Sequence, residues 1–298
     1  MVEHIAGIIP PIVTPFDEQE EIDEAAVVAE VKYLVHQVGV HGIAVGGSTG
    51  EGHTLGVEEF RRLVGVVADA VAGRVPIIAG IIANSTREAV LRARAIQDLP
   101  VAALQVTPVH YLFTPDDEMM FRHFAMLPEQ TGKPVLVYNV VPWAYCSPQF
   151  LARLIREVPG VIGVKQSAGD LKSLADLLLL LNGQGVVLSA VDALLYPSFV
   201  LGAHGAIAAI CTAVPELCVA LWNAVQRGDN AQAGELHRKL LRVWNAIAGN
   251  NLPAAVKYAL QLQGRSGGRP RMPLAWPSPT QQQAIREALE AAGVARAV

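Results

Sequence analysis

Lys165 has the clearest potential for chemistry, because it lies inside an apolar run, VIGVK, at residues 161–165. The other five of the six lysines fall on expected amphipathic helices or at a helix end before a strand, where we expect solvated ammonium groups. An ammonium enclosed by strands loses hydration, which favours the free amine needed to attack a carbonyl carbon. The alternative is a structural role, in which a buried Lys165 pairs with Asp192 or Glu51.

Two neighbouring segments could assist such an amine. Tyr138 ends the preceding apolar run, and its hydroxyl can move a proton between oxygens, as imine formation and C–C cleavage both require. The alternative is a structural role, in which the Tyr138 ring packs in the core at the end of a strand. The stretch Gly46–Gly50 presents consecutive backbone N–H groups, including that of Gly47, and the hydroxyls of Ser48 and Thr49. This combination is typical of a receptor for a carboxylate.

The elements that must position these residues follow an alternating pattern of short β-branched runs and longer amphipathic stretches. The runs predict strands at Gly7–Thr14, Gly42–Gly46, Pro76–Ile82, Ala102–Thr107, Val135–Asn139, Val161–Gln166, Val186–Ala190 and Ala206–Ile210. The stretches predict helices at Asp23–Val38, Val57–Val71, Thr86–Gln97, Pro115–Glu129, Pro148–Glu157, Leu171–Leu181, Ala193–Leu201 and Pro215–Arg227. Nearly continuous apolar strands, each followed by a helix, indicate a parallel sheet covered by helices.

Eight such units predict an α/β fold, a closed (β/α)8 barrel formed by residues 1–227. Residues 228–298 are expected to form a C-terminal helical extension packed on the barrel. In such a barrel the active site lies where the strands end, which adds His110, Tyr111, Ser167 and Asp192 to the candidate substrate-binding residues.

Composition excludes several other classes of protein. The net charge is −4 and no basic cluster exceeds two or three residues, which argues against nucleic acid and against an anionic membrane surface as partners. Hydrophobic residues make up 52% of the chain and charged residues 17%, so we expect an apolar surface and self-association. The uncharged stretch 193–215 is broken by Pro197 and two glycines, and the MVEH start lacks the basic character of a signal peptide. We therefore expect a cytoplasmic protein.

Two other chemistries fit the sequence poorly. The segment GSTGEGHT at 47–54 approaches the phosphate-binding pattern G-x4-G-K-[ST], but His53 stands where the lysine must be. The eight histidines show neither H-x-x-x-H nor H-E-x-x-H spacing, so we expect no metal site.

With these motifs in order, the chain resembles the dihydrodipicolinate synthase/N-acetylneuraminate lyase family of class I, Schiff-base-forming aldolases over essentially its whole length. The motifs that carry the resemblance are VTPF at 13–16, GGSTGE at 46–51, VTP at 106–108, YNV at 138–140, GVKQSAGD at 163–170 and GAHG at 202–205. Several ordered motifs at matching strand ends are far more specific than any one of them.

The resemblance implies a barrel that is usually a tetramer, so we expect a homotetramer or a homodimer, and it implies roles for individual residues. Lys165 would form a covalent imine with pyruvate or another 2-oxo acid, without metal or organic cofactor. Tyr138 would act as acid and base. Ser48 and Thr49 would bind the carboxylate and pass protons, and Ile207 would line the pocket near the imine.

These roles predict a lyase that cleaves or forms an aldol, or dehydrates a 2-keto-3-deoxy acid. In the lysine-biosynthetic members an arginine follows the Tyr-Asn-Val-Pro stretch and holds the second substrate's carboxylate, whereas here no arginine follows Tyr138 before Arg153. We therefore treat 4-hydroxy-tetrahydrodipicolinate synthase as the alternative. A further alternative, from a different class, is a non-catalytic barrel that binds 2-oxo acids.

Two features of the step that follows imine formation, in which the second substrate or leaving group takes part, stay open. The tyrosine that the synthases borrow across a subunit contact corresponds to His110 or Tyr111, in an uncertain register. Together with Phe113 and Trp143, Tyr111 is expected to make the far part of the pocket aromatic, which favours a substrate with a partly apolar tail.

Overall fold

The computed structural model describes residues 5–294, so the MVEH start lies outside the described residues. Eight parallel strands form one sheet in the order β1-β8-β7-β6-β5-β4-β3-β2. The strands are β1 (Gly7–Ile8), β2 (Ile43–Val45), β3 (Ile77–Ile81), β4 (Ala103–Val106), β5 (Val135–Asn139), β6 (Val161–Gln166), β7 (Val186–Ser189) and β8 (Gly205–Ala206). The ring closes beside β2, where Ala44 N donates to Pro10 O and Ile12 N donates to Ala44 O, each at 2.9 Å. The predicted (β/α)8 barrel is confirmed.

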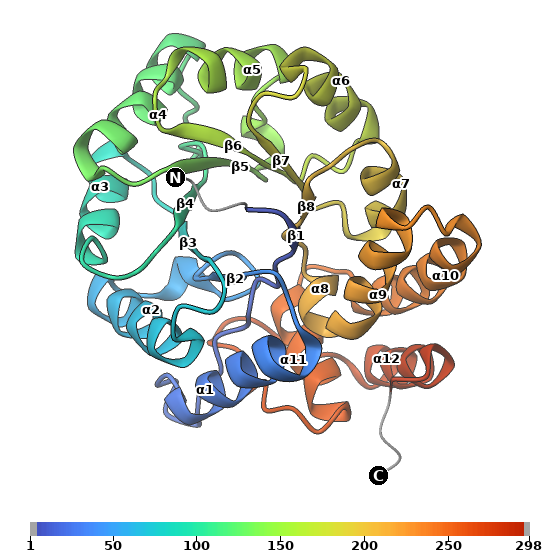
Figure 1. Cartoon of the computed structure of the whole chain (residues 1–298). Helices are drawn as coiled ribbons and strands as arrows, with labels where there is room; N and C mark the ends of the chain where they lie inside the picture. Colours follow the sequence, from blue (N-terminus) through green and yellow to red (C-terminus); the bar gives the residue numbers. More distant parts are fainter. Residues whose placement is uncertain (1–4, 295–298) are drawn as a thin grey trace.

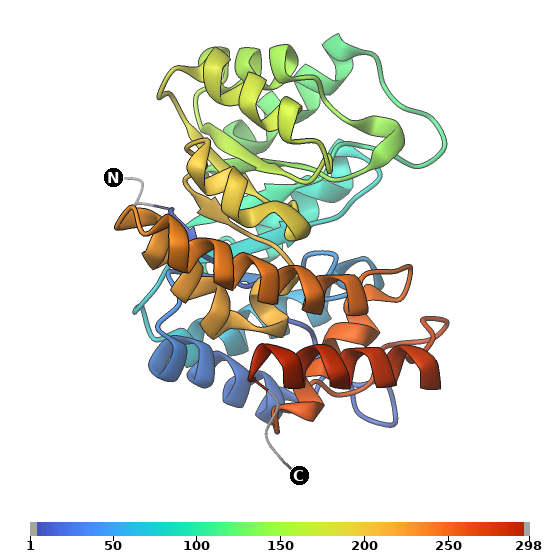
Figure 2. The ribbon, with the colours of Figure 1, turned by 90° about the vertical axis from the view of Figure 1, so that its right-hand side faces the viewer.

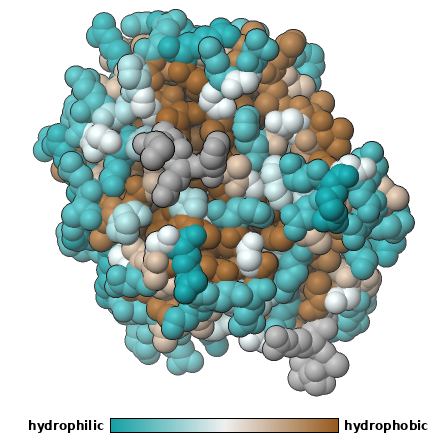
Figure 3. Space-filling view, in the orientation of Figure 1, coloured by the Kyte–Doolittle hydropathy of each residue, from teal (hydrophilic) through white to brown (hydrophobic). Residues whose placement is uncertain are grey.

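Helices surround the strands (Figure 1). Those that alternate with the strands are α1 (Glu24–Lys32), α2 (Val57–Val71), α3 (Thr86–Ala95), α4 (Asp117–Thr131), α5 (Pro148–Glu157), α6 (Leu171–Leu181), α7 (Leu195–Val200), α8 (Ile210–Ala213) and α9 (Pro215–Gln226). The strands β5 and β6 and the helices α2, α5 and α6 have the predicted limits. Apolar side chains gather over the strands on the face seen in Figure 3, with hydrophilic residues over the helices around them.

Most of the other elements differ from the predicted limits by one or two residues at an end, and three differ more. The first strand is shorter because Pro10 and Pro11 have no N–H to donate to the sheet. The eighth strand ends at Ala206, and Ile210 instead begins α8, where its N–H donates to Asp192 Oδ1 at 2.8 Å. The first predicted helix changes at its end into a π-helix, Tyr33–Val38.

Three further helices follow the barrel: α10 (Asn230–Ile247), α11 (Leu252–Leu262) and α12 (Pro279–Ala292). The helix α10 packs against α9 and α12, as Figure 2 shows. One apolar cluster contains Ala206 of β8 together with Val243, Val256 and Leu289 from these three helices. The extension therefore shares a core with the barrel, while the division at residues 227 and 228 stays a prediction.

No helix among the described residues has the length and apolar character needed to cross a membrane. The uncharged stretch 193–215 instead contains α7, β8 and α8.

Candidate active site

A cavity of about 970 Å³ opens where the strands end. The predicted site residues that line it are Ser48, Thr49, His110, Tyr138, Lys165, Ser167, Asp192 and Ile207. Gly47 and Tyr111 are not among its lining residues.

Lys165 lines this cavity near the end of β6, with 3% of its surface exposed. Tyr138 is its partner in the register between β5 and β6, so the two side chains lie next to each other. The Lys165 Nζ atom is 3.7 Å from the centre of the Tyr138 ring. None of the ion pairs of residues 5–294 involves Lys165. The Lys165 side chain is thus enclosed without an ion pair to any carboxylate of these residues.

The turn after β2 lines the same cavity as Lys165. The hydroxyl of Tyr138 donates to Ser48 Oγ at 3.1 Å, which joins the turn to β5. Within the turn, Glu51 N donates to Ser48 O, while Gly50 N and Gly52 N both donate to Gly47 O. The backbone N–H groups of Ser48 and Thr49 make no hydrogen bond with the rest of the described chain. Two N–H groups and two hydroxyls at a cavity wall can receive a carboxylate.

Gly47 supports this turn from outside the cavity. A Cβ at this position would come within 2.8 Å of the Gln105 Nε2 atom, so the site tolerates no side chain without a shift of Gln105. The prediction that the Gly47 N–H itself meets the substrate finds no support in the cavity lining.

Asp192 lies at the start of a short 3-10 helix after β7. Burial raises the pKa of its carboxyl to about 6, although the hydrogen bond from Ile210 N and the charge of Lys165 act in the opposite direction. Its carboxylate holds the start of α8 and makes no ion pair with Lys165 among the described residues.

Lys257 corrects the expectation that every lysine except Lys165 is solvated. It is fully buried on α11, and its Nζ lies 2.5 Å from Glu51 Oε1. Burial lowers the pKa of Lys257 to about 8, while the nearby Glu51 carboxylate opposes this shift. The helical pattern identified Lys257 as part of an amphipathic stretch but not which face would be covered. Glu51 is therefore the partner of Lys257 and not of Lys165.

The expectation of an aromatic far wall is wrong for the described chain. Tyr111, Phe113 and Trp143 are 66%, 81% and 67% exposed, and none of them lines the cavity. Their loops turn outward, with Leu112 in a left-handed conformation at φ 51°. The Trp143 indole N–H donates to His110 O at 2.8 Å, which fastens the two loops together on the outside.

The far wall comes instead from the C-terminal extension, a contribution that the sequence analysis missed. Its lining residues are Trp244, Asn250, Leu252, Pro253, Arg271, Met272, Pro273 and Leu274. The Gly-, Arg- and Pro-rich stretch at 264–273 was visible in the sequence as an interruption between helices, but no local pattern says that it reaches the barrel.

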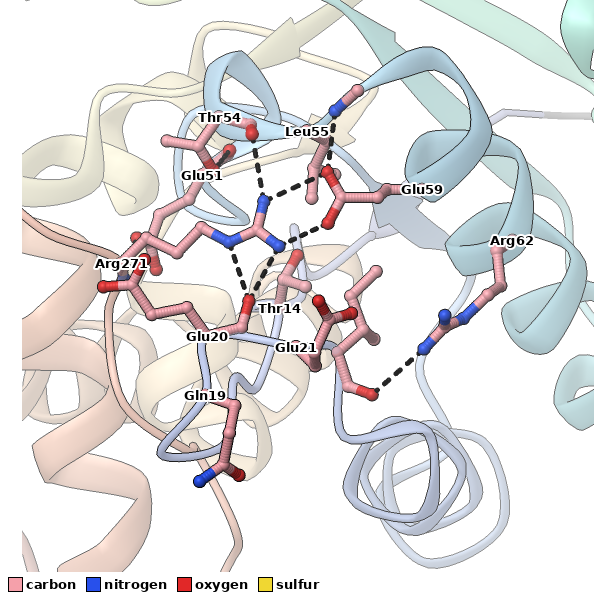
Figure 4. A network of polar contacts seen from close by, with 12 residues as sticks. Thr14, Gln19, Glu20, Glu21, Glu51, Thr54, Leu55, Glu59, Arg62 and Arg271 are labelled. Atoms are coloured by element: carbon pink, nitrogen blue, oxygen red, sulfur yellow. Dashed lines mark hydrogen bonds and ion pairs between the residues drawn. The ribbon is translucent and has the colours of Figure 1, made fainter.

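Arg271 is the one arginine in the cavity lining, and its guanidinium is already occupied. It makes an ion pair with Glu59 on α2 and donates to the carbonyl oxygens of Glu20 and Thr54, as Figure 4 shows. The far part of the cavity is therefore mostly apolar and offers no free guanidinium among the residues that the structure describes.

The described residues contain no group of three or more histidine, cysteine, aspartate or glutamate side chains that could hold a metal ion.

Comparisons with known proteins match nearly the whole chain and point to one family. The sequence model of the Dihydrodipicolinate synthetase family matches residues 4–292. The 4-hydroxy-tetrahydrodipicolinate synthase of Methanopyrus kandleri is 34% identical over 97% of both chains, and the enzyme of that name from Pseudomonas aeruginosa is 35% identical over 97% of this chain and 99% of its own. The crystal structure of a dihydrodipicolinate synthase from Acinetobacter baumannii complexed with pyruvate is 30% identical, covers 97% of this chain and 99% of its own, and superposes with a TM-score of 0.92.

Proposed function

The chain belongs to the dihydrodipicolinate synthetase family and is a lyase, and from this premise we propose that Lys165 forms an imine with pyruvate or another 2-oxo acid. The proposal covers aldol condensation or cleavage, in which the C3–C4 bond of the longer 2-oxo acid forms or breaks, and dehydration, in which a proton from C3 and the hydroxyl from C4 leave as water. It needs no metal and no organic cofactor, because the imine nitrogen itself accepts the electrons.

The reaction begins when Lys165 Nζ adds to the 2-oxo carbon and the oxygen leaves as water, which produces an iminium ion. Loss of a proton from C3, or breakage of the C3–C4 bond, then produces an enamine. In the condensing direction, C3 of the enamine attacks an aldehyde carbon and the aldehyde oxygen takes up a proton. Water adds to the iminium carbon at the end and frees the lysine.

The neighbouring residues have distinct parts in these steps. Tyr138 is beside the amine, and its hydroxyl contacts Ser48 Oγ, so the pair can carry protons to and from the substrate oxygens. The N–H groups and hydroxyls of Ser48 and Thr49 can bind the carboxylate of the 2-oxo acid. Ile207 lines the same cavity with an apolar, buried side chain.

One observation carries the proposal: a 3%-exposed lysine that makes no ion pair with a described carboxylate lines a cavity of about 970 Å³. A lysine with a purely structural role would be paired, as Lys257 is with Glu51. A protein that merely binds 2-oxo acids needs no nucleophile at this position.

The second candidate is 4-hydroxy-tetrahydrodipicolinate synthase itself, and the names of the relatives favour it at 34% and 35% identity. That product carries two carboxylates, so its formation from pyruvate requires an amino-acid aldehyde with a carboxylate of its own. The apolar far wall and the occupied guanidinium of Arg271 favour an aldehyde with an uncharged tail. The relatives and the cavity thus support different second substrates for the same first half-reaction.

Borohydride reduction in the presence of pyruvate tests the first half-reaction. We expect the mass of a reduced pyruvate imine on the peptide that contains Lys165. The variants Lys165→Ala and Lys165→Arg should lose the adduct and the turnover, because neither can form an imine with a ketone. The absence of an adduct on the wild-type protein at saturating pyruvate would refute the proposal.

Product analysis then separates the two candidates. The protein is incubated with pyruvate and either the amino-acid aldehyde or a panel of uncharged aldehydes, and the products are identified by mass spectrometry. A product from the amino-acid aldehyde at the higher kcat/KM supports the synthase, and one from an uncharged aldehyde supports the other lyase activity.

A further inference from the structure

The turn that carries Ser48 and Thr49 ends in an unfavourable backbone conformation. Glu51 has φ 53° and ψ 32°, in the left-handed region that residues with a Cβ avoid. Such a conformation persists when the surroundings hold it in place, and it is often found where function depends on it. The backbone hydrogen bonds within the turn do not involve the Glu51 side chain. The contacts that hold this side chain therefore come from outside the turn.

Two segments of the C-terminal extension hold the Glu51 carboxylate. Lys257 of α11 donates to Glu51 Oε1 at 2.5 Å, and the backbone N–H of Arg271 donates to Glu51 Oε2 at 2.9 Å. Lys257 also donates to Arg269 O at 2.7 Å, which joins the two segments. Glu51 is 1% exposed and Lys257 is fully buried, so each charge depends on the other.

The motif VTPF, at residues 13–16, contacts the same assembly. The hydroxyl of Thr14 donates to Gly50 O at 2.6 Å, next to Glu51 in the turn. The ring of Phe16 lies 4.7 Å from Lys257 Nζ and 4.2 Å from the Arg271 guanidinium carbon. Arg269 N donates to Phe16 O at 2.9 Å. The proposed chemistry does not use this motif. The motif nevertheless contacts the turn itself and the lysine and arginine segments of the extension that hold the turn in place.

We infer that Lys257 and Glu51, with Thr14, are positioning residues that hold the Ser48–Thr49 turn in the geometry that receives the substrate carboxylate. The helical extension thereby sets the affinity for the 2-oxo acid, although it supplies no catalytic residue. The inference rests on the proposed function, since it assigns the turn to the carboxylate of the acid that forms the imine.

Paired variants test this role without leaving a buried charge unpaired. The variant Lys257→Met/Glu51→Gln removes both charges at the turn. Its matched control, Arg265→Met/Glu30→Gln, removes a second buried ion pair, which joins the segment after α11 to α1 and lines no part of the cavity. Both variants should lower the Tm, because each removes an ion pair between the extension and the barrel.

The measurement is the pyruvate concentration that gives half-maximal borohydride trapping. We expect this concentration to increase about tenfold for Lys257→Met/Glu51→Gln, because the loss of a charged hydrogen bond typically changes an equilibrium constant by about a factor of ten. The control should trap pyruvate as the wild type does. Thr14→Val keeps the shape of the side chain and removes one tie, so a smaller, severalfold increase is expected, and it decides the question if the double variant does not fold.

Trapping of acetone distinguishes loss of carboxylate binding from general damage to the fold. Acetone forms an imine but has no carboxylate, so its trapping should be the same in the wild type and the positioning variants, and the preference for pyruvate should fall. An unchanged half-saturation in Thr14→Val and the double variant, or an equal increase in the Arg265→Met/Glu30→Gln control, would overturn the inference. A wild-type protein that traps no pyruvate would instead refute the proposed function.

Discussion

Asp192 illustrates how one side chain at the cavity can set a dependence on pH. Its carboxyl has a pKa near 6 in the folded protein, above the ordinary value of 3.8, because burial disfavours the charge. The folded state therefore binds more protons than the unfolded state between these two values. This contribution to stability is present at low pH and is lost as the pH rises through about 6.

Asp192→Asn is expected to stabilise the protein at neutral pH. The amide oxygen can still accept from Ile210 N, while the cost of the buried charge is removed. The gain should be ~1–2 kcal/mol at pH 7.5, reduced from the full shift because the carboxyl borders an open cavity. Thermal unfolding from pH 4.5 to 8 should show a difference in Tm that grows across the lower part of this range and is constant above pH 7. A difference that does not vary with pH would contradict the assignment.

At the scale of elements, the segment at 271–274 forms a wall of the site although it lies far from the strands in sequence. Met272 lines the mouth of the cavity and is 80% exposed, so it can be exchanged without disturbing the core. Its neighbour Arg271 is committed to Glu59 and to backbone carbonyls. A cation added at Met272 would therefore be the first free guanidinium at this wall among the described residues.

Met272→Arg is expected to shift the preference toward aldehydes that carry a carboxylate. The ratio of kcat/KM for a charged over an uncharged aldehyde should rise about two- to fivefold, as an exposed ion pair contributes ~0.5–1 kcal/mol. Added salt should diminish the effect. The control is Met119→Arg on α4, a methionine that is 52% exposed and lies outside the cavity lining. Equal ratios in the two variants would show that the wall does not select the tail.

At the scale of the whole molecule, two loops on the outside of the barrel expose large apolar side chains. Tyr111, Leu112 and Phe113 follow β4, and Trp143 follows β5 and is bonded to the first loop through His110 O. Contiguous exposed aromatic groups of this kind mark contact surfaces. The predicted homotetramer or homodimer would cover them, and His110 would lie at the border between this surface and the cavity.

Phe113→Glu is expected to weaken self-association, because a carboxylate would be buried in the contact. The dissociation constant should rise at least tenfold, ~1.4 kcal/mol or more. Light scattering after size exclusion, over a range of protein concentrations, measures the change. Leu91→Glu, at another exposed apolar position on α3, should leave the mass of the assembly unchanged. A monomeric wild-type protein at every concentration would refute the prediction of an oligomer.

The local pattern of the sequence was sufficient to predict the barrel and the candidate residues at the strand ends. The limits of β5 and β6 follow from their apolar runs, and these runs end at the neighbouring side chains of Tyr138 and Lys165. Periodicity predicts such features because a strand covered on both faces is apolar along its whole length. The order of the motifs was sufficient for the family.

The tertiary structure alone decided which distant segments meet. Lys257 and Glu51 are 206 residues apart, and the helical pattern of α11 does not reveal that its lysine reaches the turn after β2. The outward direction of Phe113 and the wall formed by Met272 were equally hidden. A sequence pattern records that a face will be covered, because burial selects for apolar residues, but it does not record what covers it. Lys165 could therefore be found in the sequence, whereas the residues that hold the Ser48–Thr49 turn in its cavity could not.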